Sequence, residues 1–203
     1  MTGKDAMAEA AAAGQPTPRR PKRKDPTHPR NFKPCVPGAL VLCPTRELAQ
    51  QVAHDAIDLV RHAKGLRVAH VVGGMPYAVQ IARLQNADLV VATPGRLLDL
   101  QRSGQIQLEQ VQFLVLDEAD RMLDMGFLPS LRIILDELPS KRQTMLFSAT
   151  MGQSVAGLVA SYVHNPVHIA VEVCAETAAR IDQPAPFAVN GIIAGREQPA
   201  HYR

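Results

Sequence analysis

The chain has 203 residues, 46% of them hydrophobic, and a formal net charge of +3, which suits one globular domain with tails. Its three cysteines, Cys35, Cys43 and Cys174, are odd in number and lack metal-ligand spacing, so we expect unpaired thiols in a reducing compartment. The N-terminus has no apolar leader, and no apolar run approaches the roughly 18 residues of a membrane span, so we predict a cytoplasmic protein without a membrane partner.

The positive charge is concentrated in the first 34 residues, which hold eight Lys and Arg against three Asp and Glu, a net +5. Residues 35–203 carry a net −2. The segment PTPRRPKRKDPTHPRNFKP alternates proline with basic residues and has no apolar periodicity, so we predict that residues 1–37 are a disordered tail or insert. Such a tail either binds phosphate backbones through its charge or is a solvated leader.

After this tail, short apolar runs alternate with helical patterns. The run ALVLC predicts a strand over residues 39–43, and the next segment predicts a helix over 46–60. The apolar face of that helix comprises Leu48, Val52, Ala56 and Leu59. Further strands are predicted over residues 67–72, 88–92, 113–116, 144–147 and 167–171. Between these strands, one helix is predicted to end near Gln85 and another to follow Pro94. Helical segments are predicted to reach Leu138, and a further helix to cover 153–163. This alternation predicts an α/β fold with a largely parallel sheet.

Polar or glycine-rich segments follow five successive strands. In chain order they are PTRE, GG, TPGR, DEAD and SAT. In a parallel sheet with right-handed crossovers, all strands end at the same edge, and ligands of open α/β sheets bind there. The sequence therefore predicts a single binding edge built from these five segments.

The apolar run FLVL leads directly into Asp117 and Glu118. An isolated ionised carboxylate is costly to bury, so both side chains are expected where the strand ends. One interpretation is an acidic start to the next helix, facing the positive end of its dipole. The other is a magnesium–nucleotide site, in which Asp117 holds the metal and Glu118 orients the attacking water. Ser148 and Thr150 either hydrogen-bond toward this acidic cluster or cap the helix after the fifth strand.

The other strand ends offer groups that bind phosphate. They are Pro44, Thr45, Arg46, Gly73, Gly74, Thr93, Pro94, Gly95 and Arg96. Free amides at a helix start, together with a guanidinium, favour an anion, and glycine lets another backbone approach closely. Ordinary helix capping is the alternative for each position taken alone. Several phosphate-sized sites along one edge favour a nucleic-acid backbone, because its phosphates repeat.

The motifs VLDEADRMLDMGF, ALVLCPTRELAQQ, VVGG, VATPGRLLDL and TMLFSAT resemble, in order and spacing, the first RecA-like domain of DEAD-box ATP-dependent RNA helicases. The likeness covers residues 38–173. It implies a three-layer RecA-like (P-loop NTPase-like) domain, with ATP and Mg²⁺ as cofactors of the intact protein and single-stranded or structured RNA as its partner.

The same resemblance implies roles for individual residues. Asp117 would hold magnesium through water, and Glu118 would be the catalytic base. The residues implied in coupling the nucleotide site to RNA are Asp120, Ser148, Ala149 and Thr150. Those implied in RNA binding are Pro44, Thr45, Arg46, Glu47, Gly73, Gly74, Thr93, Pro94, Gly95 and Arg96.

The sequence departs from the family pattern at both ends. None of its six lysines lies in the family's phosphate loop, a glycine-rich segment ending in Gly-Lys-Thr or Gly-Lys-Ser, and Thr2-Gly3-Lys4 is at most a remnant of it. We therefore expect a partial domain over residues 38–173 that lacks the phosphate-loop strand and leaves neighbouring strands unpaired. Residues 174–203 are expected to be a linker-like tail.

Three hypotheses about function stay open. The chain is a truncated portion of an RNA helicase, inactive alone because it lacks the phosphate loop and the second RecA-like domain. Alternatively, it is an RNA-binding module without ATPase activity. The third hypothesis is an unrelated α/β domain that uses the same edge for another ligand.

Overall fold

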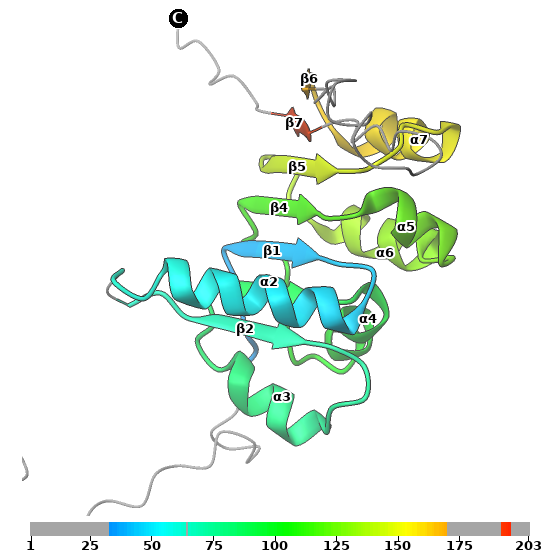
Figure 1. The fold of residues 1–203 in the computed structure, drawn as a ribbon. Coiled ribbons are helices and arrows are strands. Elements are labelled where there is room, and N and C mark those ends of the chain that lie inside the picture. The colour runs from blue at the N-terminus through cyan, green and yellow to red at the C-terminus, as the bar shows by residue number, and fades with distance from the viewer. Residues whose placement is uncertain (1–32, 64, 170–191, 196–203) are drawn as a thin grey trace, which may run out of the picture.

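The computed structural model describes residues 33–63, 65–169 and 192–195, which form a seven-stranded sheet with helices on both faces (Figure 1). The strand order is β2-β3-β1-β4-β5-β7-β6. The strands are β1 (Ala39–Leu42), β2 (Val68–Val71), β3 (Leu89–Ala92), β4 (Phe113–Leu116), β5 (Gln143–Phe147), β6 (Pro166–Ile169) and β7 (Ile192–Gly195). The helices are α2 (Arg46–Leu59), α3 (Tyr77–Leu84), α4 (Pro94–Arg102), α5 (Ala119–Asp124), α6 (Leu128–Glu137) and α7 (Gln153–Tyr162).

These elements confirm the predicted α/β fold with a largely parallel sheet. The five strands from β2 to β5 pair in parallel, and their bounds agree with the predicted ranges to within one residue at each end. The predicted segment up to Leu138 is divided into α5 and α6. Residues 1–32 of the predicted tail over 1–37, and most of the predicted tail over 174–203, lie outside the described residues. Residues 33–37 are described, and there the predicted disorder was wrong, because Cys35 is 3% exposed and forms a parallel β-bridge with Ile106.

The strand β7 was not predicted from the sequence. It lies between β5 and β6 and pairs antiparallel with both. Its residue Ile193 is opposite Leu146 of β5 on one side and opposite His168 of β6 on the other. The expectation that a missing phosphate-loop strand would leave neighbouring strands unpaired does not hold for β5, which pairs with β4 on one side and β7 on the other. Backbone N–H and C=O groups along a strand edge can pair with an extended segment running in either direction, so a short strand from far along the chain satisfies them.

The predicted apolar face of α2 was wrong at Leu59, whereas Leu48 and Val52 of that face pack against a core cluster. Ala49 and Ala53 are buried, whereas Leu59 is 84% exposed. A helix of 14 residues is about 21 Å long, whereas a four-residue strand spans about 13 Å, so the last turn of α2 extends beyond the strands. Alanine faces the sheet because its small side chain lets helix and strands approach closely.

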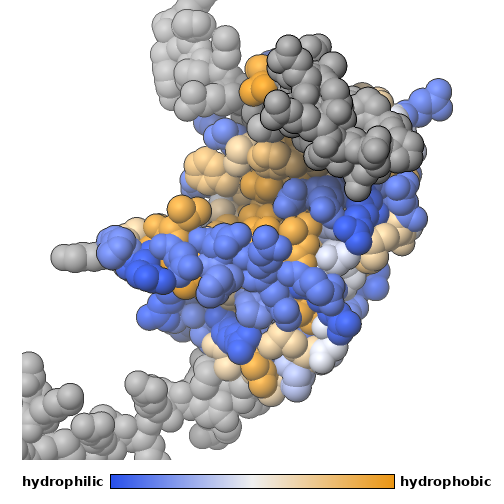
Figure 2. Space-filling model, in the orientation of Figure 1, coloured by the Kyte–Doolittle hydropathy of each residue, from blue (hydrophilic) through white to orange (hydrophobic). Residues whose placement is uncertain are grey.

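The two faces of the sheet are covered unequally. Leu114 and Leu116 of β4 belong to a large core cluster with residues of α4, α5, α6 and α7. On the other face, α2 packs against a smaller cluster, and Phe113 of β4 is 47% exposed. Figure 2 shows hydrophobic side chains gathered beside the hydrophilic outer surface of α2, over strands that this helix leaves open. One face of β4 therefore presents apolar side chains to solvent.

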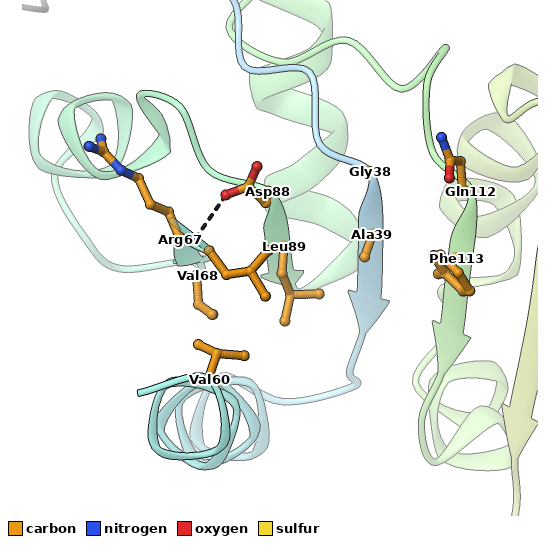
Figure 3. A pocket seen from close by; sticks show the side chains of 10 residues that line it. Gly38, Ala39, Val60, Arg67, Val68, Asp88, Leu89, Gln112 and Phe113 are labelled. Carbon is orange, nitrogen blue, oxygen red and sulfur yellow. Dashed lines mark hydrogen bonds between the residues drawn. The ribbon is translucent and has the colours of Figure 1, made fainter. Parts of the chain in front are cut away.

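A pocket of about 350 Å³ lies on the α2 side, at the amino ends of the parallel strands (Figure 3). Val60, Val68, Leu89 and Phe113 supply most of its apolar lining. Asp88 closes one side, and its carboxylate accepts a hydrogen bond from the backbone N–H of Arg67 at 2.8 Å. The pocket continues the apolar surface of Phe113 and lies at the opposite edge from the five polar strand ends.

The thiols of Cys35 and Cys43 are unpaired and buried, as the odd cysteine count predicted, whereas Cys174 lies outside the described residues. Burial, together with the nearby carboxylates of Asp117 and Glu118, raises the pKa of the Cys43 thiol to about 12. The Cys43 thiol therefore stays neutral and packs as a small apolar side chain at the end of β1.

The unequal covering of β4 gives a test with adjacent residues. Phe113→Thr removes exposed apolar surface and keeps a residue that favours strands, so it is expected to reduce self-association and change the free energy of unfolding by less than about 0.5 kcal/mol. Leu114→Ala, on the buried face, is expected to lose about 2–5 kcal/mol. Urea unfolding and light scattering over a concentration series measure both. Equal losses of stability would contradict the assignment of the two faces.

Candidate functional site

The five predicted segments meet at one edge of the sheet. Leu42 of β1 is paired with Ala92 of β3 and with Leu116 of β4, so these strands end side by side. β2 and β5 extend the same parallel arrangement, and the arrowheads of β1, β2, β4 and β5 point the same way in Figure 1. The prediction of a shared edge is confirmed.

Asp117 is the first residue after β4. Its backbone N–H donates to the carbonyl of Leu42 at 2.9 Å, which ties this position to the end of β1. The side chain is half-buried, and one carboxylate oxygen accepts a hydrogen bond from the backbone N–H of Glu118 at 3.0 Å. Burial raises the pKa of Asp117, the hydrogen bond from Glu118 opposes that rise, and the negative charge of Glu118 adds to it.

Glu118 has a left-handed backbone, with φ 48° and ψ 54°, at the N-cap position of α5. This conformation costs a non-glycine residue about 1–2 kcal/mol. The carboxylate makes no capping hydrogen bond and instead contacts Arg121 at 3.1 Å. Neither Asp117 nor Glu118 accepts a hydrogen bond from the backbone N–H groups of Asp120 and Arg121 in the first turn of α5, because other residues do so.

Those other residues are Asp120 and Ser148. The Ser148 hydroxyl accepts from the backbone N–H of Asp120 at 3.3 Å and donates to the carbonyl of Thr150 at 2.7 Å. The Asp120 carboxylate accepts from both the backbone N–H and the hydroxyl of Thr150, each at 2.9 Å. The predicted hydrogen bonds between the SAT segment and the acidic cluster are confirmed. Ala149 lies exposed between the two, with no polar side chain to contribute.

Arg46 lies against the loop after β2. Gly74 has φ +79°, and a Cβ atom there would collide with the guanidinium of Arg46. The positive φ favours glycine at this position, whereas the exposed end of the flexible Arg46 side chain could shift to admit a Cβ atom. Arg46 itself is exposed, and its Nε lies 4.0 Å from the carboxylate of Glu47, while a Cβ atom on Gly73 would lie 4.0 Å from the arginine side chain.

The starts of α2 and α4 differ in their caps. The Thr45 hydroxyl accepts from the backbone N–H of Leu48 at 3.3 Å, so ordinary capping describes this residue, and Pro44 before it is buried. Thr93 occupies the N-cap of α4 without a side-chain capping bond, and Pro94 follows in the first turn. No atom lies within 4 Å of a Cβ built on Gly95, which leaves space for a ligand at this helix start.

Two residues that hold this edge together, Gln80 and Tyr77, were not predicted from the sequence. Gln80 is fully buried; its side chain accepts from the backbone N–H of Val72 at 3.0 Å and donates to the carbonyl of Met75 at 2.9 Å. The ring of Tyr77 lies 4.2 Å from the guanidinium carbon of Arg96. A fully buried glutamine needs partners for its amide, and the polar position within the apolar pattern of α3 was the available signal.

The described residues fit magnesium better than they fit a nucleotide. They contain no group of three or more His, Cys, Asp or Glu that could hold a metal. The pair Asp117 and Glu118 suits Mg²⁺, which keeps several waters and commonly binds one or two carboxylates together with substrate phosphates. The described residues also contain no Gly-Lys-Thr or Gly-Lys-Ser loop, so they provide no cradle for the phosphates of ATP.

A sequence model of the DEAD/DEAH box helicase family matches residues 3–158. The chain therefore belongs to the DEAD/DEAH box helicase family. The ATP-dependent RNA helicase RhlB of Pseudomonas putida is 47% identical over 140 residues, which cover 67% of this chain and 35% of that protein. The ATP-dependent RNA helicase DeaD of Haemophilus influenzae is 45% identical over 149 residues, covering 72% of this chain and 24% of that protein.

Solved structures show the same fold. The crystal structure of a hypothetical ATP-dependent RNA helicase from Sulfolobus tokodaii has a TM-score of 0.60 and 47% identity, covering 64% of this chain and 39% of that one. A DEAD box protein from Methanococcus jannaschii has a TM-score of 0.60 and 41% identity, covering 64% of this chain and 35% of that one. The chain thus spans between 24% and 39% of the length of these relatives. None of the described helices is long and apolar enough to cross a membrane.

The raised pKa of Asp117 gives a test of its environment. The pKa of Asp117 in the folded protein lies above its ordinary value of 3.8, so the ionised carboxylate destabilises the fold. The protein is therefore more stable when Asp117 is protonated, and this extra stability is lost as pH rises through the pKa of Asp117 in the folded state. Asp117→Asn is therefore expected to raise the melting temperature at pH 7. The difference should shrink toward zero below about pH 3.8, where the carboxyl is protonated in both states.

Thermal melts between pH 3 and 8 measure this difference. Asp55→Asn, which changes an exposed carboxylate of α2, is the matched control and should shift stability by less than about 0.5 kcal/mol. A lower melting temperature for Asp117→Asn at pH 7 would show that ionised Asp117 stabilises the fold.

Proposed function

We propose that the chain is part of a DEAD-box helicase that remodels RNA with energy from ATP hydrolysis. The observation that carries the proposal is the joint placement of Asp117 and Glu118 at the end of β4, next to a carboxylate, Asp120, that is bonded to Thr150 after β5. The acidic pair is thereby two residues along the chain from a side chain that is hydrogen-bonded to the neighbouring strand end. Such a link is what coupling between hydrolysis and a second ligand requires.

The RNA surface in this proposal is the part of the same edge formed by β1, β2 and β3. Arg46 and Arg96 supply guanidinium groups that suit phosphate, and the open space at Gly95 leaves room for a backbone. Contacts of this kind are blind to base sequence, which fits an enzyme that acts on many RNAs. Single-stranded or structured RNA is the proposed partner.

Within the intact protein, Asp117 would hold Mg²⁺ through water, and Glu118 would orient the water that attacks the nucleotide. The residues proposed to couple this site to RNA are Asp120, Ser148, Ala149 and Thr150. A second RecA-like domain is the proposed partner for activity, and a cytoplasmic location remains a prediction. Bound Mg²⁺ would supply charge neutralisation for the phosphates.

A second candidate function is RNA binding without ATPase activity. It is favoured by one observation, the lack of a phosphate loop among the described residues. In this case the RNA surface would act by itself, and Asp117 and Glu118 would have no nucleotide to act on. The two functions differ in whether the chain binds ATP.

The 203-residue chain is expected to bind Mg–ATP no tighter than millimolar. Hydrogen bonds to charged phosphates contribute about 1.5–3 kcal/mol each, so losing three of them weakens binding by roughly 10³-fold or more. Isothermal titration calorimetry measures the affinity directly. Micromolar affinity would rule out the second candidate function and point to phosphate-binding residues beyond the described ones.

A chimera tests the catalytic roles. Residues 38–169 are joined to the upstream segment and second domain of the Pseudomonas putida RhlB protein, and RNA-stimulated release of phosphate is measured. Glu118→Gln keeps size and hydrogen bonding but removes the base, so turnover is expected to fall by about 10²-fold or more while ATP still binds. Glu137→Gln, at the end of α6, is the control and should leave turnover unchanged. Parental turnover in Glu118→Gln would contradict its catalytic role.

A further inference from the structure

Arg96 is held by groups from a different helix. Its guanidinium carbon lies 4.2 Å from the ring centroid of Tyr77, the first residue of α3. Its Nη2 donates to the carbonyl of Met75 at 3.4 Å. Its Nη1 is buried and has no hydrogen-bond partner among the described residues. The face of the Tyr77 ring is thus a main source of electrostatic stabilisation for this guanidinium, because aromatic faces attract cations and can accept N–H groups.

We propose that Tyr77 is a positioning residue, whose aromatic ring fixes the guanidinium of Arg96 in place to bind an RNA phosphate. The inference rests on the proposed function, which makes Arg96 part of the RNA surface. An arginine side chain has many rotamers, and restricting it before RNA arrives removes part of the entropy lost on binding. A planar guanidinium in a fixed orientation also matches phosphate through two parallel hydrogen bonds.

The ring of Tyr77 is itself anchored. Its hydroxyl donates to the carboxylate of Asp99 at 3.3 Å, so α3 and α4 are joined on both sides of the ring. Tyr77 remains 45% exposed, which is more than a residue that serves only to fill a core would show. The ring therefore lies at the surface, where its removal need not unfold the domain.

The carbonyl of Met75 extends this arrangement to the loop after β2. It accepts hydrogen bonds from two donors, the side-chain amide of Gln80 and the guanidinium of Arg96. Gly74, which makes room for Arg46, is the residue immediately before Met75. The two arginines of the proposed RNA surface are therefore connected through one short segment, and Tyr77 holds the second of them.

The test measures binding of the 203-residue chain to a fluorescein-labelled single-stranded oligouridylate by anisotropy, over a series of salt concentrations. Tyr77→Leu is expected to weaken binding about three- to tenfold, the range that a cation–π contact supports. It should also reduce the slope of log K against log salt by about one phosphate contact, as Arg96→Ala does. Tyr77→Phe, which keeps the ring, should bind like the parent. The double variant Tyr77→Leu/Arg96→Ala should bind like Arg96→Ala alone.

Several results would overturn the proposal. If Arg96→Ala binds RNA like the parent, the proposed RNA surface is wrong at this position and the role of Tyr77 fails with it. If Arg96→Ala weakens binding but Tyr77→Leu does not, the RNA surface stands and only the positioning role is wrong. A loss in Tyr77→Phe equal to that in Tyr77→Leu would assign the effect to the hydroxyl.

A structural role for Tyr77 has its own signature. Thermal melts of each variant are measured beside the binding curves, and Tyr77→Met serves as a second variant without a ring but with a long apolar side chain. Weaker binding at an unchanged salt slope, together with a lowered melting temperature, would overturn the positioning role. A reduced slope at a parental melting temperature in either non-aromatic variant supports it.

Discussion

The parallel register of β1, β3 and β4 determines where every polar group of the site lies. Leu42, Ala92 and Leu116 are paired across these strands, so the residues that follow each of them emerge side by side. Parallel strands that are largely covered on their faces have their main opportunity to present polar groups to solvent where they end. The carboxylates of Asp117 and Glu118, the start of α4 and the start of α2 are neighbours for this reason, although up to about seventy residues separate them in the chain.

The hydrogen bonds at the edge divide it into two connected parts. Around β4 and β5, Asp120, Ser148 and Thr150 share four hydrogen bonds that join one helix start to the next strand end. Around β2 and β3, the carbonyl of Met75 joins Gln80 to Arg96. The first part adjoins the acidic pair, and the second adjoins the basic residues. The division matches the proposal that hydrolysis and RNA binding occupy neighbouring parts of one edge.

The sequence was sufficient to predict the parallel strands and the shared edge, because apolar runs and the polar segments after them are local patterns. It was insufficient where the role of a residue or segment depends on contacts with another helix or strand far away in the chain. Ala49 and Ala53 of α2 are buried beside the predicted Leu48 and Val52 because the distance to the sheet favours a small side chain, and periodicity does not report that distance. Tyr77 was missed because its importance arises from a guanidinium contributed by α4. β7 was missed because its pairing depends on the free edge of β5 and not on its own pattern.

The left-handed backbone of Glu118 limits how far the thermal stability of this protein can be raised without loss of function. Glycine or asparagine at this position would relieve steric strain, so a search for thermostable variants would favour either one. Both would remove the carboxylate that the proposed chemistry needs. Stability and turnover therefore compete at a single residue, and variants selected only for heat resistance would be expected to lose function there first.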